Sequence, residues 1–511
     1  MKKYFLVYPR VFYPAIITIV LFITIVIVGG SAVEEFFKNI HGTVTKYTSW
    51  LFIVGVNLFV LASLWIAFGK YGRYKLGGEN TKPEFSLVSW LSMLFSAGLG
   101  IGLLYYGVFE PISHYANPPM ETFSEPQKAI QSLTFTYLHW GVHGWAIYCV
   151  LGLALGYYTY NKKLPFSIRS IFFPLLGKKI YSIYGDMIDI IAVVATLFGV
   201  ATSLGIGSTQ LATGINYVFG IQAGIESQIV IIAFITLIAT ISVVTGLKKG
   251  ILFLSQLNII LATLFLIIIL FLSDTFGIIR IFIESSGMYF QRFIELSTWS
   301  SAFINPQWQN QWSIFYYAWW VAWAPFVGMF IARISKGRSL REFVFGVIAV
   351  PVFLSFFWFS TLGGSALLLE METPGIISTD VLNDSSTAMF VFLKQFPWSI
   401  ITSLMALIVV AIFFITSSDS GSLVIDSIST GGKLNPPVGQ RILWAVTEGL
   451  VAIALLIGGG LSAMQAVNVS SGILFLLILF LVTYSLIRSV RRIHIEVSRK
   501  SQRVKKASTD F

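Results

Sequence analysis

Long apolar runs are the feature of this 511-residue chain that most restricts how it can fold. A helix needs about 20 consecutive apolar residues to cross the hydrocarbon core of a bilayer. Inside lipid the backbone polar groups must be bonded internally, so such runs are expected to be helices. Twelve segments meet the requirement and predict an all-α integral membrane protein with twelve transmembrane helices. They lie at 12–30, 50–68, 86–108, 130–157, 186–212, 226–246, 248–272, 311–332, 343–366, 396–420, 440–460 and 463–487.

The composition agrees with this prediction, because 56% of the residues are hydrophobic and only 11% are charged. A water-soluble fold cannot enclose that much apolar surface, so lipid must be the solvent. The net charge of +11 would fit a nucleic-acid partner, but the cations stand in short loops and in the C-terminal tail. We therefore expect a membrane protein with no nucleic-acid partner, no enzyme activity and no organic cofactor. The single cysteine, Cys149, lies in an apolar run and is expected to be a buried thiol.

Charge alternates between successive loops. Lys and Arg concentrate after the even-numbered spans, and acidic residues dominate the opposite loops. Because cytoplasmic loops carry the excess of positive charge, both termini are predicted to be cytoplasmic and the protein to be a multi-pass protein of the cell membrane. The basic loops hold Lys70, Arg73, Lys75, Lys162, Lys163, Arg169, Lys178, Lys179, Lys248, Lys249, Arg333, Lys336, Arg338, Arg341, Lys433 and Arg441. The acidic loops hold Glu110, Glu121, Glu125, Glu370, Glu372, Asp380 and Asp384.

One apolar segment does not fit a span. Thr275 to Trp299 has apolar residues at helical spacing with charges between them, which predicts an amphipathic helix in the outer interface. If the first two spans are peripheral, five spans remain on each side of this segment, which is the arrangement of an inverted repeat. The predicted organisation is two peripheral helices, a first repeat, the interfacial helix, a second repeat and a basic tail. The boundaries are 1–85, 86–272, 273–305, 306–487 and 488–511.

Glycines and a proline mark two spans as candidates for interrupted helices. The third span contains "GLGIG", with Gly98, Gly100 and Gly102 in five positions, at a cost of roughly 1 kcal/mol each in helix propensity. Such residues allow the backbone to unwind and to offer its polar groups to a ligand. The eighth span contains Pro325 and Gly328, so interruptions are expected in corresponding helices of the two repeats. Helix packing through a GxxxG pair is the alternative reading of the glycines.

Aromatic residues gather on one face of two spans. Helical spacing places three aromatic residues of each span within arcs of roughly 100° and 140°. The residues are Trp319, Trp320 and Trp323 on the eighth span, and Trp140, Trp145 and Tyr148 on the fourth. His139 and His143 point elsewhere and are expected to be hydrogen-bonded core histidines with no metal-ligand cluster beside them.

A box of aromatic faces suits a quaternary ammonium ion. Such a cation has no N–H to donate and is held by cation–π attraction of about 0.5–2 kcal/mol per ring. The predicted box contains no Asp or Glu. That absence favours a guest that carries its own negative charge, because a zwitterion leaves little net charge to neutralise.

These motifs resemble the betaine/choline/carnitine transporter family. The resemblance covers nearly all twelve spans and is strongest in "AWWVAWAPFVGMFIARISKGRSLREF", Ala318 to Phe343, with "GLGIG" and "HWGVHGWAIY" in the expected order. It implies a LeuT-like fold of 5+5 inverted repeats preceded by two peripheral helices. It also implies a homotrimer that carries compatible solutes bearing trimethylammonium groups.

The resemblance assigns roles to the aromatic residues. Trp140, Trp145, Tyr148 and Trp320 match the family's aromatic box, and Trp319 and Trp323 match its transport-path and substrate-contacting tryptophans. Members that take up choline with protons tend to have Asp at the position of Gly102, so glycine here favours glycine betaine. Sodium-independent carnitine exchangers tend to have Tyr at the position of Trp323 and Met at that of Val327. Their absence here implies uptake coupled to sodium.

The resemblance also implies two sodium sites. The first would use the hydroxyls of Thr416 and Ser417 with backbone carbonyls of Ser96, Leu99 and Phe413. Ordinary helix–helix hydrogen bonding is the alternative reading of the two hydroxyls. The second site would use Thr196 and Phe326, but Val200 stands where a further threonine is usual.

Two acidic residues and the basic tail complete the set of candidates. Asp419 and Glu448 lie within spans, where a carboxylate is functional by default, although Asp419 could instead cap or pair near the cytoplasmic end of its span. The tail holds seven Lys and Arg residues between Arg491 and Lys506 and predicts an anchor to anionic lipid. It is short, so strong osmotic sensing is not expected.

The leading hypothesis is a sodium symporter for glycine betaine. Choline, carnitine, ectoine and proline are rival substrates, and proton coupling or exchange are rival mechanisms. A channel or a sensor on the same fold is the alternative from a different class.

Overall fold

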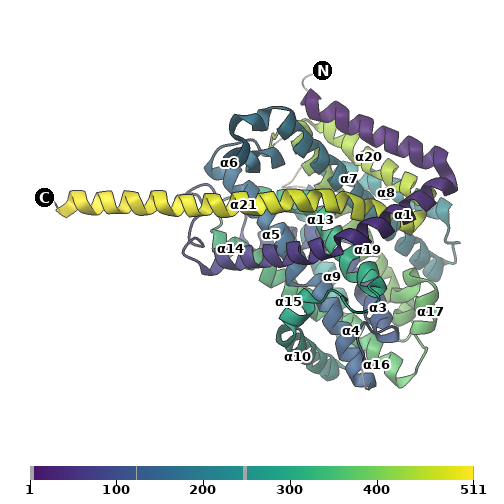
Figure 1. The fold of residues 1–511 in the computed structure, drawn as a ribbon. Coiled ribbons are helices and arrows are strands. Elements are labelled where there is room, and N and C mark those ends of the chain that lie inside the picture. Colours follow the sequence, from purple (N-terminus) through teal and green to yellow (C-terminus); the bar gives the residue numbers. More distant parts are fainter. Residues whose placement is uncertain (1–4, 122–123, 246–249, 435, 510–511) are drawn as a thin grey trace.

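The computed structural model describes residues 5–121, 124–245, 250–434 and 436–509. Apart from one isolated bridge between Lys75 and Ser339, these residues form helices and loops and no strands (Figure 1). The predicted all-α class is therefore confirmed for the described part of the chain. The N-terminal helices are α1 (Pro9–Phe68), α2 (Leu87–Leu99), α3 (Gly102–Ala116), α4 (Glu125–Trp140), α5 (Val142–Gly156), α6 (Phe173–Leu176), α7 (Ile183–Phe219), α8 (Ile225–Thr245), α9 (Leu252–Leu272), α10 (Thr275–Gln291) and α11 (Phe293–Thr298).

The second half continues in the same way. Its helices are α12 (Gln307–Gln309), α13 (Phe315–Ile334), α14 (Leu340–Val344), α15 (Val350–Phe359), α16 (Ser365–Glu372), α17 (Ser378–Asn383), α18 (Ala388–Leu393), α19 (Ser399–Ser429), α20 (Val438–Ile457) and α21 (Gly460–Thr509). Short 3₁₀ or π-helical turns link several of them. These are η1 (Tyr157–Asn161), η2 (Ile168–Phe172), η3 (Gly177–Tyr181), η5 (Asn310–Ile314), η6 (Phe345–Ala349), η7 (Ser360–Gly364) and η8 (Ser385–Thr387).

Eleven helical segments of the described residues are long and apolar enough to cross a membrane. The predicted third span is not among them because it is divided into α2 and α3. Gly100, between the two helices, has φ +50°, a left-handed conformation that glycine adopts without strain. The interruption predicted from the glycine motif is therefore present. The count of twelve spans and the inverted repeat remain predictions.

Helix α1 joins the first two predicted spans. It has 60 residues, or about 90 Å at 1.5 Å per residue, and it bends back on itself in Figure 1. Two separate stretches of it, Pro9–Gly29 and Glu35–Phe68, are apolar enough to cross a bilayer.

The eighth predicted span is not interrupted. Helix α13 continues without a break through Pro325 and Gly328, so the expectation of matching interruptions in the two repeats is wrong. A proline inside a helix removes one backbone donor and introduces a steric clash, but neighbouring helices can compensate inside a membrane protein. The fourth span is interrupted instead, because Gly141 leaves the helical conformation (ψ −144°) between α4 and α5.

The predicted amphipathic segment forms α10 and the short α11. Helix α10 buries one stripe, which includes Ile278 and Tyr289, and leaves Phe276 and Ile283 exposed. The helical character of the segment is therefore confirmed, whereas its place at the outer interface stays a prediction.

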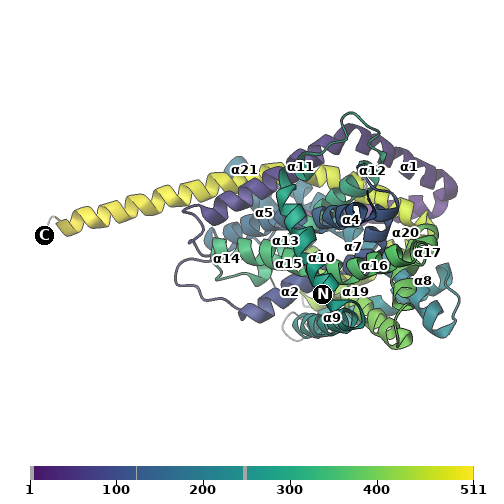
Figure 2. The ribbon, with the colours of Figure 1, turned by 90° about the horizontal axis from the view of Figure 1, so that it is seen from below.

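Helix α21 extends well beyond the bundle in both views (Figures 1 and 2). The side chains after Arg492 lie outside the described part of the chain, and so do Lys248 and Lys249 of the predicted basic loops.

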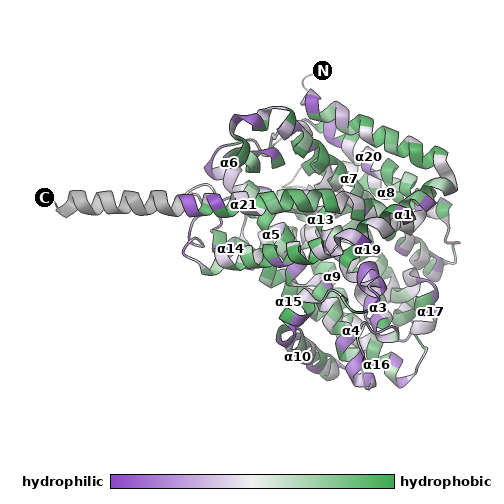
Figure 3. Cartoon of the chain, viewed as in Figure 1, coloured by the Kyte–Doolittle hydropathy of each residue, from purple (hydrophilic) through white to green (hydrophobic). Residues whose placement is uncertain are grey.

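The bundle is built around α13, every residue of which except Arg333 is buried. Helices α5, α7, α19 and α21 pack against it. The outer helices α8 and α9 expose large apolar side chains such as Phe234 and Phe271, and apolar colouring covers most of the bundle in Figure 3. Such a surface suits lipid as solvent. Cys149 is a buried free thiol, as predicted.

Candidate substrate pocket and ion sites

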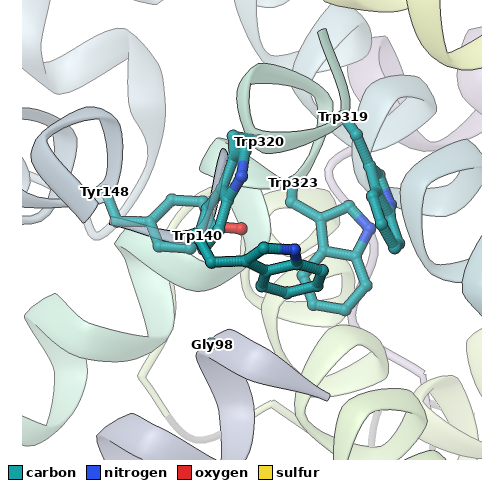
Figure 4. A pocket seen from close by; sticks show the side chains of 6 residues that line it. All are labelled: Gly98, Trp140, Tyr148, Trp319, Trp320 and Trp323. Atoms are coloured by element: carbon teal, nitrogen blue, oxygen red, sulfur yellow. The ribbon is translucent and has the colours of Figure 1, made fainter. Parts of the chain in front are cut away.

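A small cavity lies at the centre of the bundle, where α2, α4, α5 and α13 meet. It contains about 260 Å³ of space between protein atoms. Figure 4 shows its aromatic walls, which turn their rings toward a common space. The lining residues are Gly98, Trp140, Tyr148, Trp319, Trp320 and Trp323. Five of the predicted aromatic residues and one predicted glycine are thus brought together.

Trp145, the remaining aromatic residue of the predicted box, stands directly behind the wall. Its ring centroid lies 5.7 Å from those of Trp320 and Tyr148, and Tyr148 lies 5.0 Å from Trp320. Across the cavity Trp319 and Trp323 are 6.1 Å apart and nearly perpendicular. The rings support one another at the distances of edge-to-face pairs.

Single hydrogen bonds from the indole N–H groups to backbone carbonyls fix two of the rings. Trp320 donates to the His139 carbonyl and Trp323 to the Gly199 carbonyl, each at 2.9 Å. His139 is in the last turn of α4, where backbone carbonyls have no partner in the helix. The interruption at Gly141 therefore provides the acceptor that orients Trp320. With their polar edges occupied, these rings can present flat faces to the cavity.

The three glycines of the motif allow close approach of the rings. A Cβ at Gly98 would lie 2.6 Å from the Trp145 ring, and a Cβ at Gly102 would lie 2.3 Å from the Trp140 ring. Gly100 stands between the Trp323 ring and the Ser417 hydroxyl. Gly100 and Gly102 do not line the cavity. The geometry supports the packing alternative for Gly102, whereas Gly100 is the position at which the helix is interrupted.

Glu110 is a site residue that the sequence reasoning missed. It was assigned to an acidic loop, but it lies fully buried inside α3. Its Oε2 accepts hydrogen bonds from Trp140 Nε1 at 2.8 Å and from the Tyr316 hydroxyl at 2.5 Å. The box has no carboxylate in its walls, but one lies immediately behind Trp140.

Two histidines complete a cluster around the same carboxylate. Glu110 Oε1 lies 2.6 Å from His139 Nδ1 and 3.2 Å from His114 Nε2. The three side chains are close enough to be considered as metal ligands, so the expectation that no such cluster accompanies His139 is wrong. The contacts are those of direct hydrogen bonds, and both carboxylate oxygens are already engaged. His139 Nε2 is also bonded, to Ser313 at 2.9 Å, so the geometry favours a hydrogen-bonded network over a metal centre.

A signal for this cluster exists in the sequence. Glu110 and His114 are four residues apart, a spacing that places side chains on the same face of a helix. His143 does not join them: it is buried, and its ring stacks on Phe293 at 5.1 Å. Neither ring nitrogen of His143 has a hydrogen-bond partner among the described residues, so its expected hydrogen bonding is absent.

Hydroxyl groups of the first predicted ion site lie together. The Ser96 hydroxyl of α2 donates to Thr416 Oγ1 of α19 at 3.2 Å, and Thr416 donates to the Phe413 carbonyl at 3.1 Å. The Ser417 hydroxyl is buried without a hydrogen-bond partner in the described part of the chain. Leu99 is the last residue of α2, and its side chain lies outside the described residues.

The second predicted ion site is less complete. The Thr196 hydroxyl is buried on α7 and has no hydrogen-bond partner among the described residues, so no bond joins it to the Phe326 carbonyl on α13. Helices α7 and α13 are nevertheless connected by the bond from Trp323 to Gly199. Val200, one turn after Thr196, is fully buried.

The two intramembrane acidic residues are fully buried between helices. Asp419 Oδ2 accepts a hydrogen bond from Ser242 of α8 at 2.5 Å, and Glu448 accepts one from Ser418 at 2.9 Å. Because α19 continues to Ser429, Asp419 does not cap the helix. Its pairing across the α8–α19 contact is the alternative that the geometry supports.

A larger cavity of about 700 Å³ lies beside the aromatic pocket and includes Tyr105, Tyr106 and Phe109 of α3 in its lining. The Tyr106 ring also contacts Trp140 and Trp319, with centroids 5.9 and 5.8 Å apart. Tyr106 therefore lies between the larger cavity and two of the residues that line the aromatic pocket.

A bundle of apolar helices around a pocket of buried aromatic residues, with an interrupted helix beside it, is the arrangement of a membrane transport protein. Comparison with known proteins agrees. Residues 10–494 match the model of the BCCT, betaine/carnitine/choline family transporter. The chain belongs to this family, so it is a multi-pass membrane transporter and not an enzyme.

Relatives in several bacteria share about two fifths of its residues. A glycine betaine transporter of Acinetobacter baylyi is 39% identical over 94% of this chain and 73% of its own length. A glycine betaine/proline/choline/ectoine transporter of Vibrio parahaemolyticus is 41% identical over 92% of this chain and 84% of its own. Glycine betaine transporter 1 of the same organism is 43% identical over 86% of each chain.

Proposed function

We propose that this protein imports glycine betaine by symport with sodium through alternating access. The observation that carries the proposal is the pocket with the buried residues Trp140, Tyr148, Trp320 and Trp323 in its wall. Aromatic faces attract a trimethylammonium group through cation–π interaction, and no acidic side chain of the described residues lines the pocket. The names of the relatives support glycine betaine as the first substrate to test, while one of them also names proline, choline and ectoine.

Sodium is proposed as the coupling ion because hydroxyl and carbonyl oxygen atoms, which are suitable sodium ligands, lie close together where α2 ends beside α19. Thr416 Oγ1 lies within hydrogen-bond distance of both the Ser96 hydroxyl and the Phe413 carbonyl. The buried Ser417 hydroxyl lacks a partner, and a buried polar group without a partner is costly. A sodium ion would satisfy it. A Cβ at Gly100 would lie 3.1 Å from the Ser417 hydroxyl and 3.2 Å from the Trp323 ring, so the proposed ion site and the substrate pocket adjoin.

Alternating access is favoured over a channel because the pocket is closed by side chains. Tyr106 packs on Trp140 and Trp319 between the pocket and the larger cavity. A channel requires a continuous pore, whereas a transporter requires a site that opens to one side at a time. The proposal also includes cytoplasmic termini, a homotrimer, contact of the basic tail with anionic lipid and a role in osmoprotection.

Uptake of radiolabelled glycine betaine into proteoliposomes tests the proposal. An inward sodium gradient should drive accumulation above the outside concentration. Replacement of sodium by potassium should abolish accumulation, and a proton gradient should not restore it. Choline, carnitine, ectoine and proline are tested as competitors. Equilibration without accumulation would support a channel, and the absence of any flux would support a sensor.

A further inference from the structure

The carboxylate of Glu110 is the one acidic group in the described residues that hydrogen-bonds to a wall of the aromatic pocket. We propose that Glu110 is a positioning and specificity-determining residue: its negative charge, transmitted through Trp140, makes the pocket select a cationic group. The inference rests on the proposed function and extends it, because the walls themselves carry no charge.

Four donors converge on this carboxylate. Trp140 and Tyr316 bond to Oε2, and His139 and His114 bond to Oε1. An indole nitrogen can only donate. If His139 donates through Nδ1, its Nε2 can accept from the Ser313 hydroxyl, which is the arrangement of a neutral imidazole. A carboxylate that accepts four hydrogen bonds remains satisfied as an anion without a proton of its own.

No permanent cation balances that anion within the described chain, because the ion-pair partners of Glu110 are the two histidines alone. All three side chains are fully buried, so water does not screen the charge and its field reaches the pocket. The hydrogen bond also polarises the Trp140 indole, which increases the electron density of the ring face. A cation in the pocket therefore completes the charge balance.

Replacement of Glu110 by Gln and by Asp separates charge from shape. Glu110→Gln keeps the volume and one acceptor oxygen but removes the charge, whereas Glu110→Asp keeps the charge and shortens the side chain. We expect Glu110→Gln to raise the KM for glycine betaine uptake about tenfold with Vmax changed less than threefold. Glu110→Asp should raise the KM less. Glu295→Gln, a matched removal of charge at an exposed position of α11, should leave the KM unchanged.

A role in packing alone predicts the opposite order, because glutamine keeps the volume of glutamate whereas aspartate leaves a gap. An equal or smaller effect of Glu110→Gln than of Glu110→Asp would overturn the inference. A second pair of variants, at His114, leaves Glu110 in place. These variants test the inference even if the Glu110 variants fail to fold. His114→Lys introduces a permanent positive charge beside the carboxylate and should raise the KM about as much as Glu110→Gln. His114→Gln, which keeps a neutral donor, should raise it much less.

Equal effects of His114→Lys and His114→Gln would also contradict a role for the charge. Failure of the proposed function is distinguishable from failure of this inference. In the first case the wild-type protein itself does not accumulate glycine betaine. In the second case it does, but the KM values of the variants do not depend on whether the charge at Glu110 is kept, removed or neutralised.

Discussion

Hydrogen bonds at the indole N–H hold Trp320 and Trp323 in place and leave their ring faces free toward the pocket. Trp320 and Trp323 each use the indole N–H for one backbone hydrogen bond, so no polar group competes with the ring face for a cation. Removal of either ring should therefore act on substrate affinity more than on folding.

We predict that Trp320→Leu and Trp323→Leu each weaken glycine betaine binding by about 2- to 30-fold, the range that corresponds to 0.5–2 kcal/mol per ring. Isothermal titration calorimetry on the purified variants measures this change. Trp50→Leu, at an exposed position of α1, is the control. Wild-type affinity in both pocket variants would exclude the aromatic box as the substrate site.

Gly102 is a second residue whose replacement is informative. Any side chain there displaces Trp140, because a Cβ would lie 2.3 Å from the ring. Gly102→Ala and Gly102→Asp share this displacement and differ in charge. We expect both to weaken glycine betaine binding, and we expect choline to compete better in Gly102→Asp than in Gly102→Ala because the carboxylate supplies a countercharge. Equal competition by choline in the two variants would leave Gly102 with a packing role alone.

At the scale of elements, the interruption between α2 and α3 brings a helix end to the face of α19. The Ser96–Thr416 hydrogen bond spans this contact, and Gly100 lies against Ser417. An ion at this contact would stabilise one arrangement of the two elements, which provides a physical link between ion binding and the pocket.

Thr416→Ala combined with Ser417→Ala removes two hydroxyl ligands from the proposed ion site. We predict that the sodium concentration for half-maximal uptake rises at least several-fold, because a dry site offers few replacement ligands. Substrate binding at saturating sodium should suffer less, since the aromatic walls are untouched. The measurement is uptake as a function of sodium concentration.

Thr196→Ala is the comparison variant for this experiment. Its hydroxyl has no hydrogen-bond partner in the described residues, and the next residue on its helical face, Val200, offers no oxygen ligand from its side chain. We expect a smaller effect on the sodium dependence than in the double variant. A larger effect of Thr196→Ala than of the double variant would indicate that the principal ion site lies at α7.

At the scale of the whole molecule, the long α21 carries the basic tail away from the bundle (Figure 2). Its last apolar stretch ends at Arg492. We predict that a protein truncated after Arg492 keeps glycine betaine uptake within about twofold of wild type and shows little change in its response to osmotic shift. Loss of most uptake in the truncated protein, assayed in vesicles with and without anionic lipid, would instead assign the tail a regulatory role.

The sequence by itself determined the class of protein, the aromatic residues of the pocket and the interruption at Gly100. These features depend on local properties, namely apolar length, helical spacing and the conformational freedom of glycine. The continuity of α13 could not be predicted, because the effect of Pro325 depends on the neighbouring helices that pack against it.

Tertiary structure alone decided the position of Glu110 beside the pocket. The spacing of Glu110 and His114 predicts that they share a helix face, but the partners Trp140 and Tyr316 lie 30 and 206 residues away in the chain, so no local pattern places Glu110 behind the pocket wall. A buried charge is stable only where several donors converge on it, and that convergence exists only after α3, α4 and α13 have packed together.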